Sequence, residues 1–248
     1  MPRLGDMLTK ALQTMPPAMG FRPTAVSKPR LVLAATMNQL PPDAAEFLKG
    51  ADIVVFGEDI SPKQIKSALK KALQVPWGIW LKEGSQPAEA ESANADFVVF
   101  DPGKTSLDLM ASEKLQRIIS IDASLDNALL QSIGSLPLEA VYVLRYSSAE
   151  LSWLELMQLR RLSELIVKPL LIPVAITTPA IQVRTIWEAG ADGVVIAATA
   201  PGEIGEFRRM LDGIELPARR KWHRVRPTVP KIGLIPAVHR EEEEQEEE

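Results

Sequence analysis

Eight short apolar runs recur along the chain, and each is followed by a polar turn and a segment in which apolar residues have helical spacing. The predicted strands are Arg30–Thr36, Asp52–Phe56, Trp77–Leu81, Asp96–Phe100, Arg117–Ile121, Ala140–Leu144, Leu171–Ile176 and Gly193–Ala197. Most runs are apolar on both faces, which is typical of a parallel sheet covered by helices. Eight β-then-α units in 248 residues favour a single closed (β/α)₈ barrel of the α/β class over an open doubly wound sheet.

Three of the predicted strands open with the same dipeptide. Ala51-Asp52, Ala95-Asp96 and Ala191-Asp192 introduce the second, fourth and eighth strands, and each runs into a Val-Val pair. A barrel built from repeated βαβα quarter units predicts a shared start on alternate strands. The other interpretation is that Ala-Asp is common in loops that lead from a helix into a Val-rich strand. Both interpretations support the α/β class.

The composition divides the chain into three regions. Residues 1–28 hold an amphipathic segment, Met1–Met15, followed by a linker, and residues 29–216 hold the predicted barrel. We expect the N-terminal helix to pack against the barrel, with binding to a partner or a membrane surface as the alternatives. In residues 217–248 the periodicity is lost, and we expect a disordered, charged C-terminal tail.

Charge is segregated within this tail. Residues 217–240 carry seven Lys and Arg side chains and no acid, whereas residues 241–248 read EEEEQEEE. These charges cancel, so the formal net charge of −4 belongs to residues 1–216. Such a mildly acidic body gives no reason to expect nucleic acid as its partner. The basic stretch around Trp222 suits an anionic partner, but the nearby glutamates favour a solvated tail that pairs with itself.

The residue types that are missing exclude several kinds of chemistry. The chain has no Cys, so it forms no disulfide, thiolate nucleophile or thiolate metal site. Both histidines, His223 and His239, lie in the tail, so the barrel has neither a Ser-His-Asp arrangement nor a His-ligated zinc site, and we predict no metal. The chain shows no secretory signal, and no apolar stretch approaches the ~18 residues of a membrane span, which together predict a cytoplasmic protein.

Candidate catalytic residues lie where the predicted strands end. Glu58 follows the second strand, Lys82 the third, Asp101 the fourth and Asp122 the fifth. The active sites of (β/α)₈ barrels lie at the carboxyl ends of the strands and in the loops that follow. A Lys among carboxylates is suited to Schiff-base or proton-donor chemistry, and neighbouring carboxylates can divide acid and base roles. The alternative is that these side chains are ordinary solvated loop residues.

Residues 169–200, PLLIPVAITTPAIQVRTIWEAGADGVVIAATA, resemble the last two units of the phosphate-binding, aldolase-type TIM barrels. Thiamine phosphate synthase, indole-glycerol phosphate synthase and the FMN-dependent nitronate monooxygenases are similar, and Glu188–Val195 carries the match. In this group, backbone amides of the turns after strands seven and eight hold the ligand phosphate. Lys82 also resembles, in its placement, the catalytic lysine of indole-glycerol phosphate synthase.

The two turns themselves depart from that pattern. Thr177-Thr178-Pro179 stands where a Gly-Gly turn is expected, and Ala197-Ala198-Thr199 stands where Gly-Ser is expected. A Cβ blocks close approach of backbone to phosphate, and Pro179 lacks an N–H. The resemblance therefore implies a weakened site for phosphate or FMN, and we predict no cofactor. We expect ligand-binding residues at Arg145, after the sixth strand, and at Thr177, Thr178, Thr199 and Gly202 in and near these turns.

We weigh three hypotheses for the function. The first is an aldolase-like TIM barrel with altered phosphate turns that binds a small anionic metabolite, with lyase or isomerase chemistry assigned to Lys82 and the strand-end carboxylates. The second is a catalytically inactive barrel that serves as an interaction scaffold and binds a protein partner through its charged tail. The third is an FMN-dependent oxidoreductase, which the missing glycines disfavour.

Overall fold

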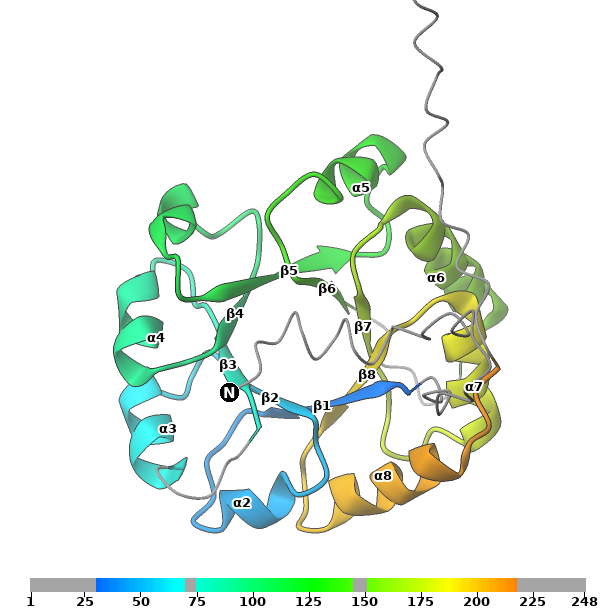
Figure 1. Ribbon diagram of the computed structural model, residues 1–248, viewed down its shortest axis with the longest axis horizontal. Coiled ribbons are helices and arrows are strands. Elements are labelled where there is room, and N and C mark those ends of the chain that lie inside the picture. The colour runs from blue at the N-terminus through cyan, green and yellow to red at the C-terminus, as the bar shows by residue number, and fades with distance from the viewer. Residues whose placement is uncertain (1–29, 70–74, 145–150, 218–248) are drawn as a thin grey trace, which may run out of the picture.

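Eight parallel strands close into a barrel in chain order, which confirms the predicted fold (Figure 1). The computed structural model describes residues 30–69, 75–144 and 151–217, so the predicted N-terminal helix, the tail from residue 218 and Arg145 lie outside the described residues. The strands are β1 (Val32–Met37), β2 (Ile53–Phe56), β3 (Trp77–Trp80), β4 (Phe97–Phe100), β5 (Gln116–Asp122), β6 (Ala140–Leu144), β7 (Leu170–Pro173) and β8 (Gly193–Ala197). Pairing of β8 with β1 closes the barrel.

Helices cover the outside of the barrel (Figure 1). They are α2 (Ala44–Phe47), α3 (Pro62–Leu69), α4 (Pro87–Ala93), α5 (Asn127–Ile133), α6 (Trp153–Leu165), α7 (Ala180–Ala189) and α8 (Glu203–Gly213). The connection between β4 and β5 differs from the predicted alternation. Its only helix is a 3₁₀ helix, η1 (Leu107–Ala111), and all residues of this connection are described. The Asp101 side chain bonds the N–H of Gly103 on one side of η1, and Ser112 bonds the N–H of Leu115 on the other. These turns leave room for a single short helix.

Several element ends follow from local chemistry. α6 begins with a capping box, in which the Ser152 side chain accepts the N–H of Glu155 and the Glu155 side chain accepts the N–H of Ser152. α7 ends at Gly190, whose φ of 122° suits glycine, and a Cβ there would collide with Ser163. β7 ends at Pro173, three residues before the predicted end at Ile176, because the chain then turns and the N–H of Thr178 donates back to the carbonyl of Ala175.

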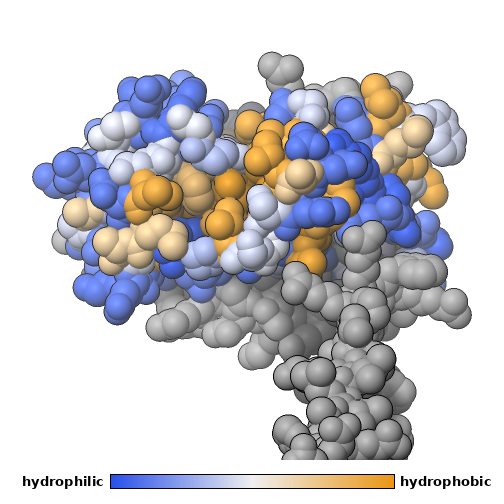
Figure 2. Space-filling model, turned by 90° about the horizontal axis from the view of Figure 1, so that it is seen from above, coloured by the Kyte–Doolittle hydropathy of each residue, from blue (hydrophilic) through white to orange (hydrophobic). Residues whose placement is uncertain are grey.

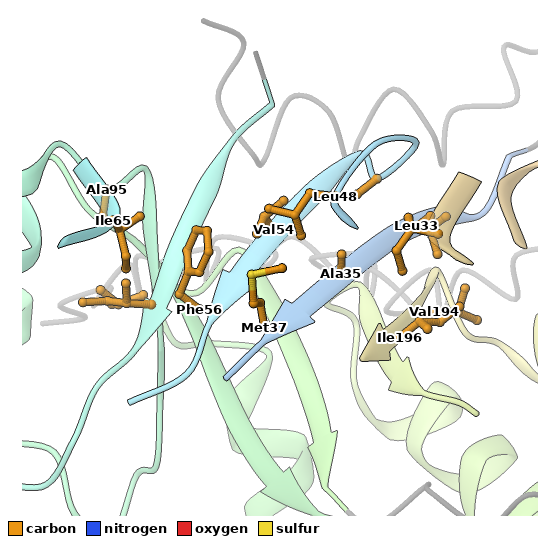
Figure 3. Packing of buried hydrophobic residues seen from close by; sticks show 14 of the residues in the cluster. Leu33, Ala35, Met37, Leu48, Val54, Phe56, Ile65, Ala95, Val194 and Ile196 are labelled. Atoms are coloured by element: carbon orange, nitrogen blue, oxygen red, sulfur yellow. The ribbon is translucent and has the colours of Figure 1, made fainter. Parts of the chain in front are cut away.

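The apolar residues form two layers, one inside the barrel and one between the strands and the helices. Ala34 of β1 and Phe97 of β4 belong to the inner cluster. Gly78 of β3 lies beside Phe97, and a Cβ at Gly78 would collide with the Phe97 ring. The alternate strand positions face the helices, as Figure 3 shows for Leu33 of β1, which shares the outer cluster with Ile65 of α3. Both faces of the strands are therefore buried, which explains their continuous apolar sequences.

Acids that precede all four even-numbered strands form the same pair of hydrogen bonds at the amino-terminal rim. Each side chain accepts the backbone N–H of a residue in the preceding strand, and the acid's own N–H donates to that residue's carbonyl. The pairs are Asp52 with Leu33, Asp96 with Trp77, Glu139 with Arg117 and Asp192 with Leu170, with N···O distances from 2.6 to 3.0 Å. The Ala-Asp repeat therefore has a structural role, and Glu139 is a fourth member that the repeat did not reveal.

Candidate functional site

The loops after β2 and β3 meet through an ion pair. Lys82 lies just beyond β3, and its side chain is 63% exposed. Its Nζ is 3.9 Å from Oδ1 of Asp59, so its ion-pair partner is Asp59 rather than the neighbouring Glu58. Glu58 is exposed in the same loop. Two of the predicted catalytic residues thus lie on adjacent loops at the carboxyl end of the barrel.

Asp101 and Asp122 lie at the ends of β4 and β5 and are half-buried. Oδ1 of Asp101 accepts the backbone N–H of Gly103 at 2.8 Å, and Oδ1 of Asp122 accepts the N–H of Ser124 at the same distance. A carboxylate that bonds the backbone two residues further on fixes a tight turn. Both acids therefore shape the loops in which they lie.

The predicted ligand-binding threonines after β7 lie several residues from the strand, because β7 ends at Pro173. Thr177 is exposed, whereas Thr178 is buried, and the backbone N–H of Thr178 donates to the carbonyl of Ala175 at 3.0 Å. The N–H of Thr178 is thus engaged within its own turn.

The turn after β8 is closed by a side chain from the following helix. Oε2 of Glu203 accepts the Thr199 hydroxyl at 2.7 Å, the N–H of Ala200 at 2.8 Å and the N–H of Thr199 at 3.3 Å. The hydrogen bond from the Thr199 hydroxyl, together with those two amides, lowers the pKa of the Glu203 carboxyl. Gly202, which precedes α8, has the positive φ of 87° that glycine adopts readily. A carboxylate of the chain itself therefore binds the donors of this turn.

A cavity of about 530 Å³ lies beside these loops, between the β3–α4 connection, α4 and the β4–β5 connection. It is present where η1 takes the place of a longer helix. Its lining includes two lysines and several hydroxyl groups, which are Lys82, Lys104, Ser85, Thr105, Ser106 and Ser112. The volume is that of a small-molecule site.

The two acids in this lining already have partners. The Ser106 hydroxyl donates to Asp108 at 2.8 Å, and the Ser112 hydroxyl donates to Glu91. Within the described ranges, Lys104 forms no ion pair. An ammonium group without a carboxylate partner among the described residues is suited to binding an anion.

Sequence reasoning singled out Lys82 as a candidate but did not single out Lys104 or the hydroxyls of the β4–β5 connection, which line the same cavity. The available signal was the interval between Phe100 and Gln116, which opens with Pro102-Gly103 and lacks a helical apolar stripe. Such an interval predicts a loop that can carry function.

Two further observations concern the described part of the chain. No helix there has the length and apolar character needed to cross a bilayer. The same residues include no group of three or more acidic or histidine side chains placed to hold a metal ion.

Comparison with known proteins places the chain by its fold. No family model matches the sequence, and no curated protein matches it. A mutant tryptophan synthase α-subunit from Pyrococcus furiosus is 11% identical, with a TM-score of 0.59 over 74% of this chain and 98% of that chain. Thiamine phosphate pyrophosphorylase from the same organism is 13% identical, with a TM-score of 0.55 over 73% of this chain and 96% of that chain.

Orotidine 5′-phosphate decarboxylase from Pyrococcus horikoshii is 12% identical, with a TM-score of 0.58 over 74% of this chain and 100% of that chain. At these identities the likeness is one of fold. The predicted resemblance to aldolase-type, phosphate-binding TIM barrels is confirmed at that level, and this chain has their barrel architecture.

Proposed function

We propose that this chain binds a small anionic metabolite in the cavity between the β3–α4 and β4–β5 connections. The observation that carries the proposal is Lys104, which forms no ion pair with any described residue and lines a cavity of about 530 Å³ together with Lys82. The cavity lies on the side of the barrel where (β/α)₈ enzymes place their sites. The names of two proteins with this fold, thiamine phosphate pyrophosphorylase and orotidine 5′-phosphate decarboxylase, include phosphorylated compounds, which supports an anionic ligand.

The proposal places the anion away from the β7 and β8 turns. Thr178 and Thr199 use their backbone N–H groups within the protein, and Glu203 adds a negative charge beside Thr199. A phosphate brought to that turn would be repelled by Glu203. The same argument disfavours FMN held by its phosphate at this position.

We propose binding as the primary activity and assign any lyase or isomerase chemistry to Lys82, which lines the cavity. Glu58, Asp101 and Asp122 would supply the acids and bases from neighbouring strand ends. The chemistry would begin when the Lys82 amine condenses with a ligand carbonyl and releases water to form an imine. Borohydride would reduce that imine to a stable secondary amine. Mass spectrometry of the Lys82 peptide after treatment with keto acids and borohydride tests this assignment, and an unlabelled peptide would remove it while leaving the binding proposal intact.

Binding itself is tested by a thermal-shift screen of the full chain against phosphorylated metabolites, keto acids and inorganic phosphate. A ligand at one hundred times its dissociation constant adds about 2.7 kcal/mol to the free energy of unfolding. We expect a stabilising anion whose effect is lost in Lys104→Ala and retained in Lys63→Ala, an exposed lysine of α3 outside the cavity. An anion that stabilises both variants equally would show that the site lies elsewhere, and a panel without any stabilising anion would reject the proposal.

A further inference from the structure

The neighbouring helices α5, α6 and α7 lie along one side of the barrel (Figure 1). Each of them exposes large apolar side chains. Leu129, Trp153, Leu154, Met157 and Ile181 are between 55% and 82% exposed, and together we call them the α6 face. All five lie toward the amino-terminal ends of their helices, so they lie at a similar height on the barrel wall. Figure 2, which views the molecule from the α5 side, shows hydrophobic patches among hydrophilic side chains on the face that it displays.

The α6 face is not needed to pack the barrel. α6 buries Leu159 and Leu162 completely on its inner side, while Trp153 and Met157 point outward. A helix on the surface of a monomer normally turns polar residues outward. A group of exposed large apolar residues that includes Trp and Met is typical of a protein–protein interface, where Trp often contributes most of the binding energy.

We infer that a second copy of this chain covers the α6 face, through a two-fold axis that sets the two α6 helices antiparallel. The charges around the face are self-complementary. Asp126, the exposed N-cap of α5, lies toward the helix N-termini, whereas Arg160 and Arg184 are exposed further along α6 and α7. The axis lies across the helices, sets α5 opposite α5 and reverses this order in the partner, so Arg160 of each copy approaches Asp126 of the other.

The arginines keep their ion pairs within each copy in this arrangement. Arg160 is 3.0 Å from Glu164 and Arg184 is 2.9 Å from Glu188, each one turn further from the apolar residues. The Arg160 guanidinium has five N–H donors, so it can keep Glu164 and also bond Asp126 of the partner, while Arg184 keeps Glu188 at the rim. The charged groups thus form a rim around an apolar centre, as in known interfaces.

The size of the α6 face fits the centre of a dimer interface. α6 has 13 residues, α7 has 10 and α5 has 7, so the helices are about 20, 15 and 10 Å long. At about 9 Å of width each, they present about 400 Å² of projected area. A standard interface buries about 800 Å² of accessible surface on each partner, so the α6 face would form the apolar centre and the surrounding charged residues the rim.

Analytical ultracentrifugation of the full chain tests the inference. We expect a dimer, and we expect Met157→Glu to raise the dissociation constant at least a hundredfold by placing a carboxylate in the apolar centre. Leu107→Glu is the matched control, because Leu107 is 85% exposed on η1, away from α6, and should leave the dimer intact. Circular dichroism of both variants shows whether the fold is retained.

Disulfide cross-linking gives a second test that does not require the protein to fold with a glutamate at position 157. The chain has no cysteine, so Met157→Cys introduces a single thiol near the two-fold axis. Mild oxidation should convert Met157→Cys into a disulfide-linked dimer and leave Leu107→Cys monomeric on a denaturing gel. A full chain that stays monomeric at about 100 μM, well above the μM limit for interfaces of this size, would overturn the inference. Equal cross-linking of both cysteine variants would overturn it as well.

The α6 face and the proposed anion site are separate. The cavity is lined by the β3–α4 connection, α4 and the β4–β5 connection, and the face is built from α5, α6 and α7. Loss of the dimer in Met157→Glu with anion binding unchanged would therefore leave the proposed function untouched. Failure of anion binding would likewise leave the dimer inference standing, because the ultracentrifugation test does not depend on anion binding.

Discussion

The Thr199 hydroxyl donates a 2.7 Å hydrogen bond to the Glu203 carboxylate, so a side chain of α8 closes the turn that follows β8. The N–H groups of Thr199 and Ala200 donate to the same carboxylate oxygen. In the phosphate-binding barrels that residues 169–200 resemble, the corresponding turn holds a phosphate. Here its donors bind a charge of the protein itself, which is why we place the anion site beside Lys104.

The Glu203 carboxyl should titrate below the ordinary glutamate range, because the Thr199 hydroxyl and two amides favour its ionised form. A lowered folded-state pKa contributes stability that is fully present above the unfolded-state pKa of about 4.3 and is lost as pH falls through the folded-state value. Carbon-13 NMR titration of the carboxyl measures the pKa directly. Thr199→Val should move the pKa upward, and an unchanged value in that variant would contradict the assigned cause.

Replacing Asp96 by alanine should destabilise the barrel by about 1–3 kcal/mol, because the N–H of Trp77 loses the carboxylate that accepts it at 3.0 Å. Asp96→Asn keeps an oxygen acceptor and should lose less. Urea denaturation measures both changes in the free energy of unfolding. Asp59→Ala is the control, since the Asp59 side chain is 80% exposed and its loss should cost about 0.5 kcal/mol or less. Equal losses in Asp96→Ala and Asp59→Ala would refute the structural role of the rim acids.

Adding a methyl group at Gly78 should cost about 3 kcal/mol or more, because its Cβ would collide with both the ring and the backbone carbonyl oxygen of Phe97. Phe97→Leu should remove only the part of the cost of Gly78→Ala that comes from the ring, and a double-mutant cycle measures that coupling. Gly213→Ala is the matched control, since a Cβ at Gly213 meets nothing within 4 Å. Additive effects of Gly78→Ala and Phe97→Leu would show that the ring does not fill the space.

Burial raises the pKa of Tyr142 to about 12. Tyr142 lies inside the barrel, with its ring centroid 5.1 Å from that of Trp80 in a T-shaped contact. Because the folded-state pKa is raised, the associated stability is fully present below about pH 10 and is lost as pH rises toward 12. The ultraviolet absorbance of tyrosinate should show a late titration that is missing in Tyr142→Phe. If the titration at high pH persists in Tyr142→Phe, it belongs to Tyr146, and the assignment to Tyr142 is wrong.

Much of the fold is predictable from local sequence because burial on both faces of a strand leaves a continuous apolar run. β6 and β8 have the predicted bounds, Ala140–Leu144 and Gly193–Ala197. The β4–β5 connection was not predictable in the same way, since the alternation suggested a helix where side-chain bonds of Asp101 and Ser112 leave room only for η1. The role of Glu139 was not predicted either, because it depends on a hydrogen bond to the backbone of Arg117 in the neighbouring strand.

The candidate site was less predictable than the fold. Sequence places Lys82 and Asp101 near strand ends, but only the folded chain shows that Lys82 meets Asp59 and that Asp101 bonds its own loop. Lys104 is separated from Lys82 by more than twenty residues, and they share a cavity because η1 is short. Side-chain direction and the partners of each charge are properties of the tertiary structure, which one sequence does not state.

The most direct test of the account is isothermal titration calorimetry of the full chain with the anion that stabilises it most. We predict one binding site per chain, an affinity that falls with added salt, and a loss of about tenfold, or ~1.4 kcal/mol, in Lys104→Ala. Lys63→Ala should bind as the unaltered protein does. Equal affinity in Lys104→Ala and the unaltered chain would contradict the claim that this cavity is the anion site.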